Sequence, residues 1–320
     1  MLPELLQVLR QGGRIVIGTH VNPDGDALGS ALAFSFALDQ LGLAHEVYCH
    51  HPAPRILEYL PGLERIRQSP EDTSPPDLAI ILDLEALDRL GPLRSFFESA
   101  RRTIVIDHHV PHEEPGDLRI VTTTSPATAA ILADLFLESE ITINADMATC
   151  LLTGIVTDTG SFRFPNTTAH SLHVAAALLE RGARLNELVE HVYMSRTIPA
   201  MRLHGWAMSR LKLDCENQLA WTVIPLSAFE ECHASDEDTE GLVNEMLAIG
   251  SVQVTAILRE SKPGRIRGSI RSRGKIDVAE AARQFGGGGH KNAAGVSFEG
   301  DIWDAERALT EALRQCLASP

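Results

Sequence analysis

Short apolar runs alternate with helical patterns in the first half of the chain, and this alternation restricts the fold more than any other feature. Arg14–Gly18, Leu78–Leu82 and Thr103–Ile106 are mainly apolar, which is typical of strands buried on both faces. Helical spacing follows the first run over Gly25–Gly42. Strands that alternate with helices form parallel sheets with both faces covered. We therefore expect an α/β fold in which helices cover both faces of a parallel sheet.

The second half of the chain has a different pattern, which indicates a second domain. Val252–Glu260 and Arg265–Arg273 predict a hairpin, and helical patterns flank it. We predict a catalytic domain over residues 1–190, a helical linker over 191–215 and a smaller C-terminal α/β domain over 216–320. The catalytic cleft is expected between the two domains.

Composition limits the classes of protein and of partner. The chain has 28 Lys and Arg against 43 Asp and Glu, a formal net charge of −15, which repels a long polyanion unless basic residues are concentrated locally. No window approaches the ~18 apolar residues of a membrane span, and the N-terminus does not resemble a signal peptide. Five scattered cysteines predict reduced thiols in a cytoplasmic protein.

Acidic and histidine residues directly follow three of the predicted strands. They are His20, Asp24, Asp26, Asp83, Asp107, His108 and His109. Ligands collect at the carboxyl ends of parallel strands, so these residues are placed where a site is expected. Each also has a simpler interpretation: Asp24 or Asp26 could cap the next helix, Asp83 could begin a turn, and the histidine pair could lie on the surface.

A further acid, Asp158, ends the helical pattern that begins near Asn144, where an ordinary polar helix end is the alternative. Six residues are then candidate metal ligands: His20, Asp24, Asp26, Asp83, His108 and Asp158. Six ligands exceed the needs of one ion and suit two. Oxygen donors suit Mg²⁺ or Mn²⁺, and the added imidazole favours Mn²⁺. Two such ions activate water for phosphoester hydrolysis.

The second domain carries a basic segment and a glycine run. Lys262–Lys275 holds six positive charges and no acid within fourteen residues, and alternation along a strand would align its arginines on one face. Gly286–Gly289, followed by His290 and Lys291, could direct backbone N–H groups at an anion. The alternatives are a solvated basic strand and a flexible loop. Together the two features favour binding of a small anion.

In this order, the motifs resemble those of the DHH phosphoesterases with a DHH-associated C-terminal domain. The matching segments are His20–Asp26, Asp83 with Asp88–Gly91, Asp107–His109, Thr157–Gly160 and Gly286–Gly295. The resemblance covers nearly the whole chain. By length and domain pair, the chain is most similar to the NrnA-type oligoribonucleases, or nanoRNases, which also dephosphorylate 3′-phosphoadenosine 5′-phosphate (pAp).

The resemblance implies two ions, usually Mn²⁺, with Mg²⁺ or Co²⁺ as substitutes. Asp83 would bridge the ions, and the remaining ligands would divide into two sets: His20 with Asp24, and Asp26 with His108 and Asp158. His109 would face the scissile phosphate, because adjacent residues of an extended segment point to opposite sides. Asp107 would orient the ligands.

The resemblance also implies a set of substrate-binding residues in the second domain. They are Arg271, Ser272, Gly287, Gly288, Gly289, His290 and Lys291. Arginine suits this role because its planar fork binds phosphate through two hydrogen bonds.

The implied function is Mn²⁺-dependent hydrolysis of short RNA or DNA oligonucleotides to 5′-mononucleotides, together with release of phosphate from pAp. The alternatives are a phosphodiesterase acting on pApA, a RecJ-like exonuclease on long single strands, an inorganic pyrophosphatase, and a catalytically inactive nucleotide-binding regulator. No partnership with a membrane or a long nucleic acid is expected. The oligomeric state, including a homodimer, is left open.

Overall fold

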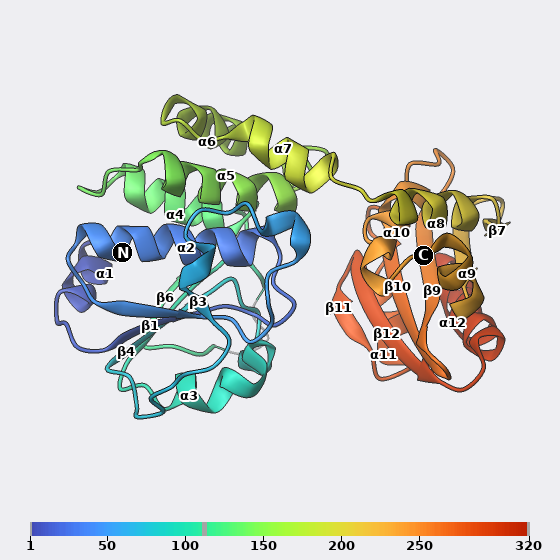
Figure 1. The fold of residues 1–320 in the computed structure, drawn as a ribbon, viewed down its shortest axis with the longest axis horizontal. Helices are drawn as coiled ribbons and strands as arrows, with labels where there is room; N and C mark the ends of the chain where they lie inside the picture. Colours follow the sequence, from blue (N-terminus) through green and yellow to red (C-terminus); the bar gives the residue numbers. More distant parts are fainter. Residues whose placement is uncertain (1, 111–113, 319–320) are drawn as a thin grey trace. The chain divides into compact units, whose positions relative to one another are not determined.

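The computed structural model describes residues 2–110 and 114–318, and the chain forms two compact units, Met1–Ser195 and Arg196–Pro320. Each unit is built on one six-stranded sheet (Figure 1). Within the described ranges, no helix has the length and apolar character needed to cross a membrane. All five cysteines are unpaired.

The sheet of the first unit is parallel throughout. Its strands are β1 (Ile15–Gly18), β2 (His45–Tyr48), β3 (Ile66–Arg67), β4 (Leu78–Leu82), β5 (Thr103–Asp107) and β6 (Leu118–Val121). They lie in the order β3-β2-β1-β4-β5-β6, and every neighbouring pair is parallel. The expectation of a parallel sheet is confirmed.

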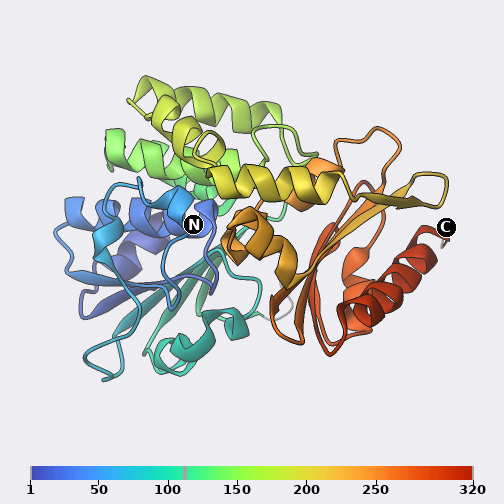
Figure 2. The ribbon, with the colours of Figure 1, turned by 45° about the vertical axis from the view of Figure 1, so that its right-hand side comes forward.

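Helices cover both faces of this sheet (Figures 1 and 2). One face packs against α1 (Leu2–Leu9), α2 (Gly25–Gln40), α4 (Thr128–Leu137) and α5 (Ala145–Asp158). The other face packs against the 3₁₀ segment Leu87–Leu93 and α3 (Arg94–Glu98), through Phe96 and Phe97. Helices α6 (Ala169–Glu180) and α7 (Leu185–Tyr193) lie beyond α5. The predicted two-sided cover is confirmed.

The strand order creates a switch point between β1 and β4. From β1 the chain adds β2 and β3 in one direction, and then adds β5 and β6 beyond β4 in the other direction. A crevice opens beyond the carboxyl ends of the strands at such a point, and ligands bind there. The residues that follow β1, β4 and β5 therefore meet at one place.

The second unit has a mixed sheet. Its strands are β7 (Lys212–Asp214), β8 (Leu219–Ile224), β9 (Val254–Lys262), β10 (Arg265–Ser272), β11 (Gly288–His290) and β12 (Ala293–Glu299). The order is β11-β12-β10-β9-β8-β7, antiparallel except between β8 and β9. The predicted hairpin forms β9 and β10, with Gly264 at a φ of +70° in its turn.

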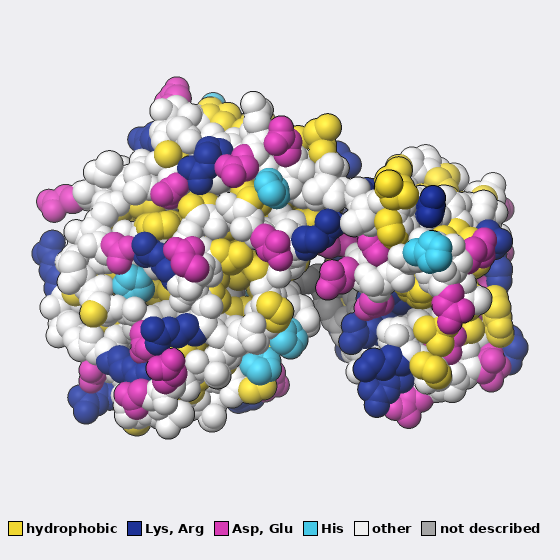
Figure 3. Space-filling view, viewed as in Figure 1, with side chains coloured by type: hydrophobic (Ala, Val, Ile, Leu, Met, Phe, Trp, Pro, Cys, Tyr) yellow, Lys and Arg dark blue, Asp and Glu magenta, His cyan; other side chains and the backbone are white. Residues whose placement is uncertain are grey.

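Helices also pack on this second sheet. One hydrophobic cluster joins it to α8 (Ile198–Met208), α9 (Leu226–Cys232) and α10 (Leu242–Met246). A separate cluster joins it to α11 (Val278–Arg283) and α12 (Ile302–Ala318). On the surface in Figure 3, Lys and Arg side chains gather over β11 and α11, whereas both signs of charge are interspersed over the first unit.

Candidate metal centre

Asp83 lies at the centre of the candidate site. It directly follows β4, is 2% exposed, and has a φ of +59°, a left-handed conformation that strains a residue other than glycine. Its Oδ2 lies 3.5 Å from His20 Nε2, and its Oδ1 lies 3.6 Å from His108 Nε2. The two oxygens of one carboxylate therefore face two different groups of side chains.

The first group consists of His20, Asp24 and Asp83. His20 Nδ1 lies 3.0 Å from the Val21 carbonyl oxygen, so Nδ1–H donates to it and Nε2 faces Asp24 Oδ2 at 3.8 Å. Asp24 Oδ1 also accepts from two backbone N–H groups in the first turn of α2, at 3.0 Å each. Asp24 therefore caps the helix and faces the site, so its two interpretations are compatible.

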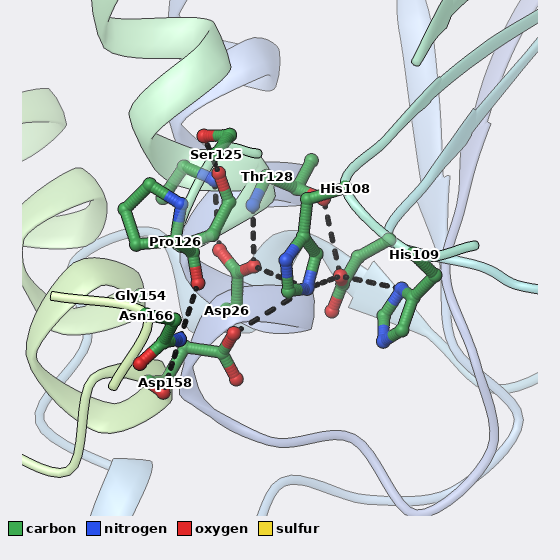
Figure 4. Close-up of polar contacts among 12 residues, drawn as sticks. Asp26, His108, His109, Ser125, Pro126, Thr128, Gly154, Asp158 and Asn166 are labelled. Carbon is green, nitrogen blue, oxygen red and sulfur yellow. Dashed lines mark hydrogen bonds and ion pairs between the residues drawn. The ribbon is translucent and has the colours of Figure 1, made fainter. Parts of the chain in front are cut away.

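The second group consists of Asp26, His108 and Asp158. His108 Nε2 lies 3.3 Å from Asp158 Oδ2 and 3.9 Å from Asp26 Oδ2, and Figure 4 shows its ring directed toward both carboxylates. Asp26 is fully buried and accepts from the backbone N–H groups of Thr128 and Ala129, at 2.6 and 2.8 Å. The first turn of α4 thus holds the Asp26 carboxylate in place.

Asp107 contacts the histidine pair. Its Oδ1 accepts from the backbone N–H groups of His108 and His109, at 2.8 and 3.2 Å, and lies 2.7 Å from His109 Nδ1. His109 Nδ1 also lies 3.6 Å from Asp83 Oδ1. Asp107 is therefore placed to orient the ring of His109 beside the two groups.

The electrostatics of the site match a cation-binding centre. Burial, and then the charge of Asp83, raises the pKa of both Asp26 and Asp158 well above the ordinary value. Burial would also raise the pKa of Asp83, but contacts with His20, His109 and His108 hold it well below its usual range. Buried carboxylates that crowd one another in this way are stabilised by a bound cation.

The donor set fits two divalent ions. It offers carboxylate oxygens and imidazole nitrogens, the mixture that suits Mn²⁺ and related ions. The separations from His20 Nε2 and His108 Nε2 to the carboxylates, 3.3–3.9 Å, are longer than hydrogen bonds. The ligand atoms of each group lie within 4.8 Å of one another, so each group would hold one ion.

Two supporting residues were not anticipated from the sequence. The Thr128 hydroxyl donates to Asp83 Oδ1 at 3.1 Å. The Asn166 side-chain amide donates to the carbonyl oxygens of Pro126 and Asp158, at 3.1 Å each (Figure 4). A threonine that begins a helix is a weak signal, and nothing in the sequence around Asn166 indicates its role.

In the second unit, Arg271 lies on β10, where exposed and buried residues alternate as a strand requires. Burial lowers the pKa of Arg271, and no acidic side chain in the described ranges lies within ion-pair distance of its guanidinium. Its Nη1 donates to the Ile270 carbonyl oxygen at 3.0 Å. A half-buried cation without a carboxylate partner is a natural contact for an anion.

The neighbouring Ser272 is differently placed. It is 7% exposed, and its hydroxyl donates to the Ile276 carbonyl oxygen at 2.8 Å and accepts from the Asn292 amide at 2.8 Å. These bonds connect β10 to the segments that follow it. The hydroxyl therefore already has an acceptor and a donor within its own domain.

Part of the glycine run forms a strand. Gly288 and Gly289 belong to β11 and pair with β12, and a Cβ at Gly287 or Gly289 would lie 2.3 or 2.4 Å from a backbone oxygen of β12. Glycine is therefore required for close packing as well as for backbone freedom. Ala293 pairs with both His290 and Arg271, so these two residues share a row of the sheet. The side chain of His290 lies outside the described part of the structure, and Lys291 is exposed.

Both the sequence and the fold match known proteins. Residues 14–155 match the DHH family, N-terminal domain, and residues 226–319 match the DHHA1 domain. A Thermus thermophilus protein named bifunctional oligoribonuclease and PAP phosphatase NrnA is 35% identical over 98% of this chain and 93% of its own. A Bacillus subtilis protein of the same name is 28% identical, over 99% of each chain.

A solved structure extends this similarity to the fold. The crystal structure of an exopolyphosphatase-related protein from Bacteroides fragilis has a TM-score of 0.92 and 27% identity, covering 98% of this chain and 95% of that one. The fold and the acid–histidine site define a two-domain phosphoesterase. The chain belongs to the DHH family, with a DHHA1 domain, and the family resemblance of its motifs is confirmed.

Proposed function

We propose that this protein is an Mn²⁺-dependent phosphoesterase that hydrolyses short oligoribonucleotides to 5′-mononucleotides and converts pAp to AMP. The observation that carries the proposal is the position of Asp83 between two ligand groups: it belongs to the first, and its Oδ1 lies 3.6 Å from His108 Nε2 of the second. The names of the Thermus thermophilus and Bacillus subtilis relatives, which match nearly the whole chain, supply the substrate class.

Two ions would be held by the two groups, with Asp83 common to both. Ions in such a site activate water as a nucleophile and neutralise charge that develops on the phosphate. His109 would donate a hydrogen bond to the phosphate or its leaving oxygen, in an orientation set by Asp107. Thr128 and the first turn of α4 would keep Asp83 and Asp26 in place, as outer contacts of metal ligands do.

We assign catalysis to residues 1–190 and substrate binding to residues 216–320; of the segment 191–215 between them, α8 and β7 pack within the second unit. Arg271 and the segment Gly287–Lys291 would bind the part of the nucleotide away from the scissile bond. The net charge of −15 disfavours a long polyanion as the substrate. Unpaired thiols are consistent with a cytoplasmic location.

One assay tests the proposal and separates its alternatives. Initial rates are measured with Mn²⁺ on pAp, pApA, a five-nucleotide RNA and a long single strand, with Asp83→Ala as the inactive control. We expect mononucleotides from the short substrates and AMP from pAp, with slow turnover of the long strand. Faster turnover of the long strand would indicate a RecJ-like exonuclease, and binding without hydrolysis would indicate a regulator.

A further inference from the structure

The turn that follows β4 packs against the loop that carries His20. The Val21 N–H donates to the Arg89 carbonyl oxygen at 2.8 Å. Gly91 has a φ of +59°, and a Cβ there would lie 2.7 Å from Val21 Cγ1, so the close approach requires glycine. Backbone contacts therefore hold the turn against the loop, and the Arg89 side chain is not needed for this purpose.

The guanidinium of Arg89 lies beside the ring of His20, at the nitrogen that does not face Asp24 and Asp83. Its Nη2 is 3.2 Å from His20 Nδ1. That nitrogen carries a hydrogen, because it lies 3.0 Å from the Val21 carbonyl oxygen, so it has no lone pair to accept from Arg89. Within the described ranges, no carboxylate forms an ion pair with Arg89. The N–H groups of a half-buried arginine thus remain available next to a candidate ligand.

The charge of the site explains how this arginine would assist phosphate binding. The four carboxylates of the ligand groups match the charge of two divalent ions, and Asp107 pairs with His109 at 2.7 Å. An incoming phosphate would nevertheless lie close to the ligand carboxylates, which repel it. A cation at the border of the ligand groups offsets that repulsion. Its attraction to the phosphate oxygens strengthens as charge develops on them.

We propose that Arg89 is a catalytic residue that binds the non-bridging oxygens of the scissile phosphate, whether a monoester or a diester. This inference rests on the proposed function. The planar guanidinium matches two phosphate oxygens at once, which an ammonium does not. Its contribution is greatest in the transition state, as for other arginines that contact a transferring phosphoryl group.

The first test compares Arg89→Ala, Arg89→Lys and the matched control Arg94→Ala. Arg94 lies a few residues further along the chain and pairs with Asp88 and Glu98 at the surface. With Mn²⁺ and pAp, we expect Arg89→Ala to lower kcat about 10²-fold or more, as removal of a transition-state donor does. Arg89→Lys should recover part of the loss, and Arg94→Ala should retain the normal rate. A normal rate for Arg89→Ala would overturn the proposal.

The second test measures binding instead of turnover. Calorimetric titration of the Mn²⁺-loaded protein with inorganic phosphate should show at least tenfold weaker binding for Arg89→Ala. Its Mn²⁺ affinity and melting temperature should match those of the unmodified protein, because backbone contacts hold the loop. Equal losses of Mn²⁺ affinity and activity would show instead that Arg89 only positions His20, which overturns the proposal.

The two tests also separate this proposal from the proposed function. Suppose the unmodified protein hydrolyses none of the nucleotides but binds phosphate in an Arg89-dependent manner. The proposed function then fails, while the assignment of Arg89 to phosphate binding stands. If nucleotides are hydrolysed at the same rate with and without Arg89, the proposed function stands and the assignment of Arg89 to phosphate binding fails.

Discussion

The two units of this protein share a plan, a six-stranded sheet with helices on both faces, but gather opposite charges in different ways. In the first unit every strand is parallel, so the acids and histidines that follow β1, β4 and β5 converge at one edge. In the second unit β10 pairs antiparallel on both sides, and its arginines line the length of a strand. A parallel sheet concentrates functional groups at a point, and an antiparallel strand spreads them over a face.

The difference has an energetic consequence. Burial, and then the charge of Asp83, raises the pKa of Asp26 and Asp158 in the first unit, so these carboxylates favour a bound cation. On β10, Arg265 and Arg267 are exposed and stay hydrated, and only Arg271 is partly desolvated. We therefore expect metal ions to bind and stabilise the first unit, and a substrate anion to bind the second.

The largest expected effect tests the convergence in the first unit. Asp83→Ala removes the carboxylate that faces His20 of one ligand group and His108 of the other. Loss of the several kcal/mol that metal ions contribute predicts a fall in kcat of about 10³-fold or more. The control is Asp88→Ala, an exposed acid in the same segment. Steady-state rates with Mn²⁺ measure the effect, and full activity of Asp83→Ala would refute the shared-carboxylate site.

The next effect separates the units by their stability. All three tyrosines lie in the first unit and all three tryptophans in the second, so tyrosine absorbance and tryptophan fluorescence report on different units. Mn²⁺ at about 100 times its Kd adds about 2.7 kcal/mol of stability, which corresponds to about 5–10 °C. We expect this shift in the tyrosine-monitored transition and a much smaller shift in the tryptophan-monitored one.

A chelator and one variant serve as controls for this measurement. EDTA should reverse the Mn²⁺-dependent shift, and Asp83→Ala should abolish it. A larger shift in the tryptophan-monitored transition would contradict the assignment of the metal to the first unit.

A smaller effect concerns the arginine face of the second unit. Arg271→Ala removes hydrogen bonds to a charged group that are worth about 1.5–3 kcal/mol, so kcat/KM for pAp should fall about 10- to 100-fold. The loss should be mainly in KM, since Arg271 is assigned to binding away from the scissile bond. Arg307→Ala, an exposed arginine on α12, is the control. A loss confined to kcat would contradict that assignment.

The smallest effect tests how the second unit is stabilised without metal. Glu306 is 9% exposed and accepts from Trp221 Nε1 at 2.5 Å and Lys212 Nζ at 2.6 Å. Glu306→Gln keeps an acceptor but loses the charge, at a cost of about 1 kcal/mol. We expect the tryptophan-monitored transition to fall by about 4 °C. The tyrosine-monitored transition should stay unchanged, and a fall in both would show that the units unfold together.

Much of the fold could be predicted from local patterns, and the strands of the first sheet that were not predicted share a physical reason. The buried central strands β1, β4 and β5 are continuous apolar runs, so their positions were predictable. The edge strands β3 and β6 were not predicted. The first is two residues long and partly exposed, and in the second buried and half-buried residues alternate. Such strands acquire their structure from pairing with a neighbour, which local sequence does not encode.

In the candidate site, too, some features follow from local sequence and others only from the tertiary structure. Residue type and spacing alone were enough to single out the acids and histidines that follow strands, because metal chemistry demands those side chains wherever they occur. Only the tertiary structure decides that Asp83 directs one oxygen to His20 and the other to His108, or that Arg89 lies against His20. These contacts join segments far apart in the chain, and they depend on the order of the strands. That order is set by packing across the whole sheet, which no short stretch of sequence contains.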